Sequence, residues 1–173
     1  AAAVVWMYVY EPYSGPINGT LTQLGLPPQP WLQSPNLAMT SLIVMAIWRD
    51  FGTAMIIYLA GLQDIPRDIY EAARLDGAKT KDIFFRITVP MLSNVTFYLM
   101  IILIVQTFQV FGAIYVMTNG GPLGSTETIV FQMYQTAFGY TEFGYAAAMS
   151  TVLFLAILLF SIIGTKIMRR GES

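Results

Sequence analysis

Long apolar stretches alternate along the chain with shorter polar ones, and three of the apolar stretches are long enough to cross a bilayer. A spanning helix needs about 20 mostly apolar residues to cross roughly 30 Å of hydrocarbon. The three stretches extend over residues 37–62, 91–117 and 145–168. Residues 1–9 are also apolar but too few to span alone, so we expect them to form the end of a further spanning helix. The pattern predicts an all-α integral membrane protein, built as a polytopic bundle of transmembrane helices.

Three polar segments connect these stretches. Residues 10–36 are rich in Pro, Gly, Ser and Asn, a composition typical of an extended loop. Residues 118–143 form a second loop that opens with Asn119-Gly120-Gly121-Pro122, and within it Thr128–Ala137 is expected to form a short helix at the membrane surface. Residues 63–90 carry most of the remaining charge.

The basic residues predict the orientation of the chain in the membrane. Five of the nine lie between the first two spans and three lie at the end of the third, whereas residues 10–36 and 118–143 contain neither Lys nor Arg. Because cytoplasmic loops carry an excess of Lys and Arg, segment 63–90 and the C-terminus are expected in the cytoplasm and the other two loops outside. The basic residues are Arg67, Arg74, Lys79, Lys81 and Arg86 in segment 63–90, and Lys166, Arg169 and Arg170 near the C-terminus.

Composition agrees with a membrane location and excludes several kinds of chemistry. Hydrophobic residues make up 55% of the 173 residues and charged residues only 11%, whereas soluble domains average about 25% charged. The net charge of −1 gives no reason to expect a nucleic acid partner. The chain has no Cys and no His, which excludes disulfides, thiol nucleophiles, histidine bases and ordinary zinc sites. We therefore expect no catalytic residue, no metal and no cofactor.

Segment 63–90 has the signals of a helix, a turn and a second helix. Pro66 suits the first turn of a helix, where its missing N–H is no loss. Gly77 suits the left-handed position that ends a helix. Thr80 is expected to cap the second helix with Asp82 in its first turn, and Pro90 marks where that helix gives way to the next span. The segment is predicted to be a helical hairpin.

The first helix of this hairpin has one apolar face with small residues. Ile69, Ala72 and Ala73 share that face at i, i+3, i+4 spacing, and Glu71 and Asp76 offer hydrogen-bond acceptors beside it. Small side chains allow the surface of another protein to approach the backbone. The residues alone leave two alternatives: a docking face for a partner protein, or an amphipathic hairpin resting on anionic lipid headgroups.

The spacing of this segment resembles the EAA loop of permeases from binding-protein-dependent ATP-binding-cassette importers. The string is Glu71-Ala72-Ala73, three residues, Gly77, nine residues, and Ile87-Thr88-Val89-Pro90. The family pattern ends in Ile-x-Leu-Pro, so Val89 is a mild departure between apolar residues. The resemblance favours the docking face, and the ATPase-coupling residues that it implies are Glu71, Ala72, Ala73, Asp76 and Gly77.

Other stretches are similar to the sugar-importer branch of that family, in particular to its maltose and glycerol-phosphate type first permease. They are Leu59–Gln63, Thr118–Pro122 and Gly144–Ala146. The resemblance implies the C-terminal part of a longer permease, in the plasma membrane of a bacterium or archaeon. It also implies three partners: a second homologous permease, a dimer of ATP-binding-cassette ATPases that grips the hairpin, and an external solute-binding protein. The chain has no Gly-x-x-x-x-Gly-Lys-Ser/Thr phosphate loop, so a partner is expected to hydrolyse the ATP.

Two charged residues lie near the middle of the first span. Each of Arg49 and Asp50 costs on the order of 2.5–3.5 kcal/mol at a helix centre on insertion scales, so neither is expected to face lipid. Adjacent residues on a helix point about 100° apart, so we do not expect the two to pair directly. Gly52 is expected to permit a kink. Either the two charges pair with polar groups of a neighbouring helix, or they line a path for solute.

The second span carries amides and a hydroxyl on or near one helix face. Gln106, Thr107 and Val110 share a face with Leu103, and Gln109 lies to one side. Such groups suit hydrogen bonds to sugar hydroxyls, and equally suit hydrogen bonds between helices. Asn94, near the cytoplasmic end, is either part of a gate or a cap. Alignment with maltose-type permeases implies that the solute path is lined by Asp50, Thr53, Gln106, Thr107 and Val110.

One hypothesis from a different class stays open at this point. Arg49 and Asp50 would be the functional pair of a secondary transporter or of an enzyme embedded in the membrane. Transport driven by an ion gradient without nucleotide would favour it. The solute also stays open among neutral sugars, oligosaccharides, polyols and glycerol phosphate.

Overall fold

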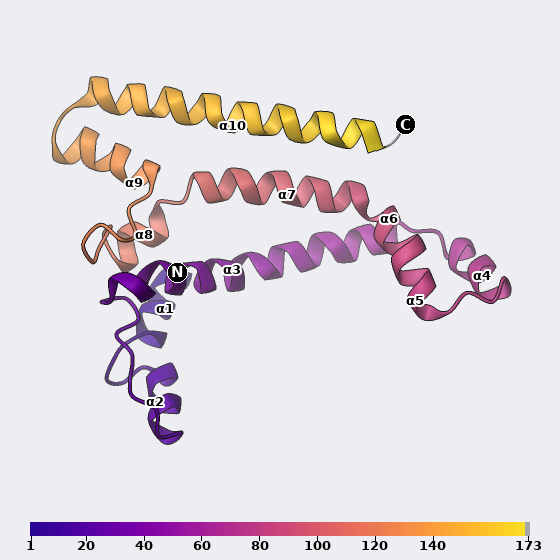
Figure 1. Ribbon diagram of the computed structural model, residues 1–173, viewed down its shortest axis with the longest axis horizontal. Coiled ribbons are helices and arrows are strands. Elements are labelled where there is room, and N and C mark those ends of the chain that lie inside the picture. The colour runs from indigo at the N-terminus through magenta and orange to yellow at the C-terminus, as the bar shows by residue number, and fades with distance from the viewer. Residues whose placement is uncertain (172–173) are drawn as a thin grey trace.

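The computed structural model describes residues 1–171 as a series of helices joined by turns, and no strand occurs in that range (Figure 1). The all-α prediction is therefore confirmed. The side chains of Arg169 and Arg170, which contributed to the predicted orientation, lie outside the described part of the chain.

Two of the expected spanning helices are present with slightly wider bounds. Helix α3 covers Pro35–Gln63 and helix α10 covers Phe143–Gly171, each with 29 residues and therefore about 43 Å long. Both are long and apolar enough to cross a membrane. Gly52 lies inside the uninterrupted helix α3, so the expected kink does not interrupt the helix there.

The expected helix over residues 91–117 is wrong, because this stretch is interrupted twice. Helix α6 (Val89–Met91) ends at Leu92, helix α7 covers Ser93–Phe108, and helix α8 covers Gly112–Met117. The helical segments on either side of Leu92 meet at an angle of 58°. The bend follows directly after Pro90, whose ring removes a helical N–H donor.

The second interruption, at Gln109–Phe111, has a hydrogen bond that helps to hold it open. The Thr128 hydroxyl donates to the carbonyl oxygen of Val110 over 3.0 Å. A side chain from a distant loop thus satisfies a main-chain acceptor that has no helical partner at the interruption. Hydrophobic periodicity carries no trace of such a partner, which explains why the sequence pattern predicted one helix.

One end of the molecule holds the main apolar core. Helix α1 (Ala2–Val9) packs there against α3 and α8, together with helix α9 (Ile129–Tyr134). A single π-helical turn, Gln135–Gly139, follows α9, so the short helix expected within the 118–143 loop is present. The buried core residues are Tyr10, Leu42, Met45, Ile114, Met117 and Phe131.

Residues 10–36 are not the extended loop that their composition predicts, because they contain helix α2 (Pro16–Gln23) and a buried asparagine. Asn18 is 2% exposed and uses all its hydrogen-bonding positions. Its Nδ2 donates to the carbonyls of Pro12 (3.0 Å) and Gln29 (2.9 Å). Its Oδ1 accepts from the Gln29 main-chain N–H (3.0 Å) and the Trp31 indole N–H (2.9 Å). One amide therefore holds both ends of this segment together.

The turn that opens the 118–143 loop depends on a glycine. Gly120 has φ of +81°, and a Cβ at this position would collide with the Phe131 ring. Nearby, the fully buried Thr126 hydroxyl bonds the Thr118 hydroxyl and the Gly121 carbonyl, both over 2.8 Å. The turn and helix α9 are thus fixed to each other by close packing as well as by polar contacts.

The predicted hairpin is present at the end of the molecule opposite to α1 and α2 (Figure 1). It consists of helix α4 (Arg67–Leu75), helix α5 (Thr80–Ile83) and a π-helical turn, Phe84–Thr88. Pro66 directly precedes α4, and Gly77 has the expected left-handed backbone, with φ of +79°.

One detail of the predicted hairpin is wrong. Thr80 is the first residue of α5 and makes no capping hydrogen bond, since the extended N-cap backbone belongs to Lys79. Asp82 does lie in the first turn, where its carboxylate faces Arg86 at 3.8 Å. The hairpin keeps its helix–turn–helix form because the glycine turn, and not the cap, ends α4.

Candidate functional site

A pocket of about 510 Å³ opens between α3 and α7. Its walls come from the middle of α3, the second half of α7, the interruption after α7 and the start of α8. The polar residues among its lining are Arg49, Asp50, Thr53, Gln106 and Gln109. The interruption therefore brings main-chain groups as well as side chains to the pocket.

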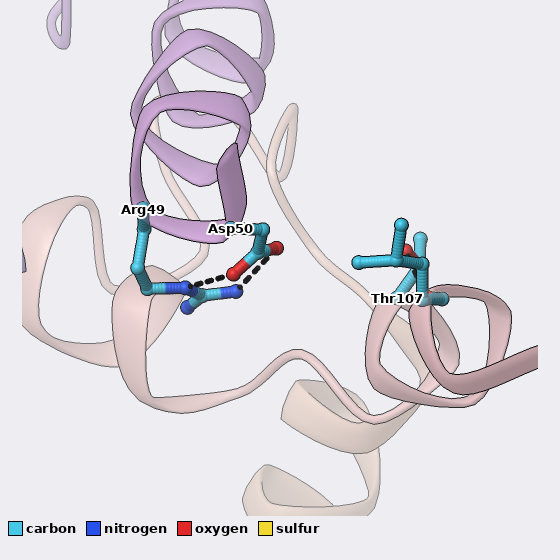
Figure 2. Close-up of polar contacts among 4 residues, drawn as sticks. Arg49, Asp50 and Thr107 are labelled. Carbon is cyan, nitrogen blue, oxygen red and sulfur yellow. Dashed lines mark hydrogen bonds and ion pairs between the residues drawn. The ribbon is translucent and has the colours of Figure 1, made fainter. Parts of the chain in front are cut away.

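Arg49 and Asp50 form a direct two-bond ion pair at this pocket (Figure 2). Arg49 Nε donates to Asp50 Oδ1 over 2.7 Å, and Arg49 Nη2 donates to Asp50 Oδ2 over 3.1 Å. The expectation that adjacent residues would not pair is wrong. An arginine side chain has three methylenes and a planar guanidinium group. It can therefore bend around the helix and form two parallel N–H···O bonds with the neighbouring carboxylate.

The ion pair stays open to the pocket. The side chains of Arg49 and Asp50 keep 42% and 27% of their exposure. Their charges cancel locally, so the pocket presents hydrogen-bonding groups without a net charge. Such a site suits polar, uncharged ligands with many hydroxyls.

Four of the five predicted solute-path residues line this pocket: Asp50, Thr53, Gln106 and Val110. The fifth, Thr107, lies on the neighbouring helix α7 (Figure 2) and lines two adjacent cavities instead. One of these, of about 260 Å³, also includes Asp50, Gln106 and Val110. The Thr107 hydroxyl donates to the Leu103 carbonyl over 2.8 Å and keeps its acceptor lone pairs available.

Sequence reasoning missed part of the lining, because it assumed one continuous helix. Gln109, Phe111 and Gly112 line the pocket, although the helical-face argument placed Gln109 to one side. The signal available in the sequence was Gly112, three residues after Gln109, at the end of a polar cluster inside an apolar stretch. A Cβ built on Gly112 meets no atom within 4 Å, so this glycine leaves open space in the wall.

The pocket lining includes a single carboxylate, Asp50. Among the described residues, no group of three or more His, Cys, Asp or Glu side chains could hold a metal ion. The chemistry available at the pocket is hydrogen bonding by the amides, the threonine hydroxyl and the ion pair.

The hairpin exposes most of the residues predicted for coupling. Glu71, Ala72, Asp76 and Gly77 are exposed, and Ala73 is half-buried. The predictions missed Leu75, which is 89% exposed at the end of α4. The end of α4 therefore leaves one large apolar side chain uncovered next to the Asp76 carboxylate.

Tyr70 and Thr88 connect α4 to the helical segment that leads back to the spans. Their hydroxyl oxygens lie 3.3 Å apart, and Thr88 is buried. The Thr88 hydroxyl also lies 3.4 Å from the Ile83 carbonyl. The hairpin is thus linked internally as well as exposed.

The opposite end of the molecule carries only acidic charge in its loops, at Glu11, Glu127 and Glu142. Hydrogen bonds from the Ser14 main-chain N–H and hydroxyl lower the pKa of Glu11, and the Tyr13 N–H adds to the effect. The Glu11 carboxylate therefore closes the first turn of the 10–36 segment.

Comparison with protein families gives one match over almost the whole chain. The family described as binding-protein-dependent transport system inner membrane component matches residues 2–171.

Curated relatives are similar over most of this chain. The arabinooligosaccharide transport system permease of Bacillus subtilis is 39% identical over 87% of this chain and 48% of its own length. The trehalose/maltose transport system permease of Thermococcus litoralis is 35% identical over 97% of this chain and 57% of its own length. A probable ABC transporter permease of Pyrococcus horikoshii is 38% identical over 91% and 54%. The chain spans about half the length of these relatives.

A solved structure has the same fold. A chain of a bacterial ABC transporter that imports the acidic polysaccharide alginate superposes with a TM-score of 0.84, over 98% of this chain and 59% of that one. Its sequence is 22% identical, so the likeness concerns the fold.

Proposed function

The chain belongs to the family of binding-protein-dependent transport system inner membrane components, and on that premise we propose that it is part of a permease subunit of a carbohydrate importer. The observation that carries the proposal is the neutral, hydrogen-bonding pocket between α3 and α7. In this proposal the pocket is a section of the solute path, and the chain itself catalyses no reaction.

The pocket supports a solute with many hydroxyl groups. The amides of Gln106 and Gln109 both donate and accept, and the Arg49–Asp50 pair adds donors and acceptors without a net charge. The relatives named for arabinooligosaccharides and for trehalose or maltose support the same class. The proposed solute is a sugar or a short oligosaccharide.

The hairpin is the proposed contact with a partner ATPase. Its exposed residues include Glu71, Ala72, Leu75, Asp76 and Gly77, and it lies in the segment that carries five basic residues. By the positive-inside rule this segment lies in the cytoplasm, where ATP is available. The segments 10–36 and 118–143 then lie outside, where a solute-binding protein would deliver the solute. A second homologous permease would complete the path.

The alternative of a secondary transporter or enzyme has no observation in its favour. It needs Asp50 as an ion-binding or catalytic carboxylate, whereas each oxygen of that carboxylate accepts a hydrogen bond from Arg49. An importer driven by ATP needs no such group.

Gly112 offers a direct test of the solute path. Gly112 lines the pocket, and a Cβ built on it has no other atom within 4 Å, so a Leu side chain there adds bulk at the pocket wall. Gly144 is a matched control, because it is also open and lies outside the pocket lining. We expect Gly112→Leu to abolish ATP-dependent uptake of labelled trehalose and arabinotriose into proteoliposomes that contain the full-length assembly, and Gly144→Leu to retain it.

The assembly of each variant is measured by size-exclusion chromatography before uptake is compared. If Gly112→Leu assembles normally and transports as fast as Gly144→Leu, the pocket is not the solute path.

A further inference from the structure

Helices α3 and α7 approach each other closely at one point, next to the hairpin. A Cβ built on Gly61 of α3 would lie 2.7 Å from Val95 Cγ2 and 3.1 Å from Leu92 Cδ2. Real Cβ atoms do not approach other heavy atoms within 3.0 Å, so any side chain at Gly61 would push the two helices apart. With Val95 and Leu92 in these positions, Gly61 lets the two helices cross this closely.

A hydrogen-bond relay fixes the same crossing. The Tyr58 hydroxyl donates to Thr96 Oγ1 over 3.1 Å, and the Thr96 hydroxyl donates to the Leu92 carbonyl over 2.9 Å. Each hydroxyl supplies one hydrogen, so the direction of the relay is determined: from α3, through α7, to the main chain at Leu92.

The crossing lies at the base of the hairpin. The hairpin leaves α3 after Gln63 and returns at Leu92, the buried residue at which the chain bends by 58°. Tyr58 and Gly61 are one turn apart on α3, and they face successive residues of α7. The two ends of the hairpin are therefore fixed to each other.

Beyond the crossing, α3 and α7 separate toward α8 (Figure 1). The pocket is lined there by Asp50 on α3 and Gln106 on α7. Asp50 and Tyr58 are eight residues apart, which is about 12 Å along the helix. A small change of the crossing angle thus changes the width of the pocket directly.

We propose that Tyr58, Gly61, Val95 and Thr96 form a pivot that transmits movement of the hairpin to the pocket, so that these four are positioning residues for coupling. This inference rests on the proposed function. The contact and the relay make the hairpin base and the adjoining parts of α3 and α7 turn as one body. Without them, the hairpin would move while the pocket stayed as it was.

The experiment measures solute imported per ATP hydrolysed by the full-length assembly in proteoliposomes, with labelled trehalose and arabinotriose as probes. Gly61→Ala introduces the clash, and we expect the ratio to fall by roughly fivefold, comparable with the loss of one hydrogen bond. Val95→Ala removes the nearest atoms, so the double variant Gly61→Ala/Val95→Ala is expected to recover most of the ratio. Thr96→Val and Tyr58→Phe break the relay, whereas Thr96→Ser keeps the hydroxyl and is the matched control.

A second measurement separates the pivot from the rest of the transporter. An introduced Cys at position 72 is cross-linked to the ATPase in each variant, and the cross-linking yield is expected to stay unchanged in Gly61→Ala. A wild-type ratio in Gly61→Ala, or a fall that Val95→Ala does not reverse, overturns the pivot. Failure of the proposed function would instead appear as absent ATP-dependent uptake in the unmodified protein.

Discussion

The segment 10–36 is predicted to lose its structure when Asn18 is changed. Asn18 makes four hydrogen bonds, two as donor and two as acceptor, with partners on both sides of α2. Asn18→Ala removes all four. Asn18→Asp keeps the acceptors for Gln29 N–H and the Trp31 indole, but it places a carboxylate against the carbonyls of Pro12 and Gln29.

The size of the effect follows from the number of bonds. A hydrogen bond contributes about 1 kcal/mol net, and a buried group left without a partner costs about 1–3 kcal/mol. Water reaches some of the partners because the bonds are only partly buried. We therefore expect Asn18→Ala to destabilise the segment by about 3 kcal/mol and Asn18→Asp by about 2 kcal/mol.

Limited proteolysis measures the opening of this segment directly. Leu24 is 70% exposed and follows α2, so chymotrypsin will cleave the Leu24–Gly25 bond once the segment opens. Cleavage follows the population of the open form when opening is fast, and 3 kcal/mol corresponds to roughly a 150-fold faster cleavage. Thr20→Ala removes one exposed hydrogen bond within α2 and is the control, with an expected change of less than about twofold. Cleavage of Asn18→Ala at a rate within threefold of the control would refute the reasoning.

Three further predictions concern the pocket, the hairpin and the turn that Glu11 closes. For the pair Arg49 and Asp50, each single variant, Arg49→Gln or Asp50→Asn, leaves one charge unpaired. The double variant is therefore expected to lose less stability than the sum of the two single losses, with a coupling energy of about 1 kcal/mol. Additive losses in a thermal-unfolding cycle would contradict this. Gly77→Ala is expected to lower the stability of the hairpin by about 1 kcal/mol, because Gly77 has a left-handed backbone with φ of +79°. The variant should insert into the membrane but show less ATP-coupled uptake, and unchanged uptake would argue against a coupling role. The lowered pKa of Glu11 means that its carboxylate stabilises the turn at Tyr13 and Ser14 above the ordinary value of 4.5, and that this contribution is lost as the pH falls through the lowered pKa. The difference in thermal unfolding between the wild type and Glu11→Gln should be present at pH 7 and vanish in acid.

Helices and turns were predicted well from the sequence where a single residue type determines the local backbone, or where the length of an apolar stretch indicates a spanning helix. The long apolar runs predicted α3 and α10, and the glycine turn at Gly77 followed from the conformational freedom of glycine. Four pocket residues followed from the resemblance to sugar permeases, since polar groups on α3 and α7 are costly unless they face a polar space.

Other features depend on partners that are distant in the sequence. The interruption at Gln109–Phe111 is held in part by Thr128, and the structure of segment 10–36 depends on Asn18 reaching Gln29 and Trp31. The Arg49–Asp50 pair is local, but it depends on the rotamer of a long side chain, which helical geometry does not determine. Hydrophobic periodicity shows which residues share a face of a helix. It does not show where a helix is interrupted by a hydrogen bond from a residue distant in the sequence, such as Thr128.

The interruption between α7 and α8 also affects how this pocket can evolve. Gly112 lines the pocket and has no side chain, so main-chain atoms form part of the wall at this position. Point mutations can therefore exchange side chains around the pocket for different solutes while this main-chain part of the wall persists. In the proposed importer, selectivity would then change through side chains on α3 and α7 while this part of the wall stays the same.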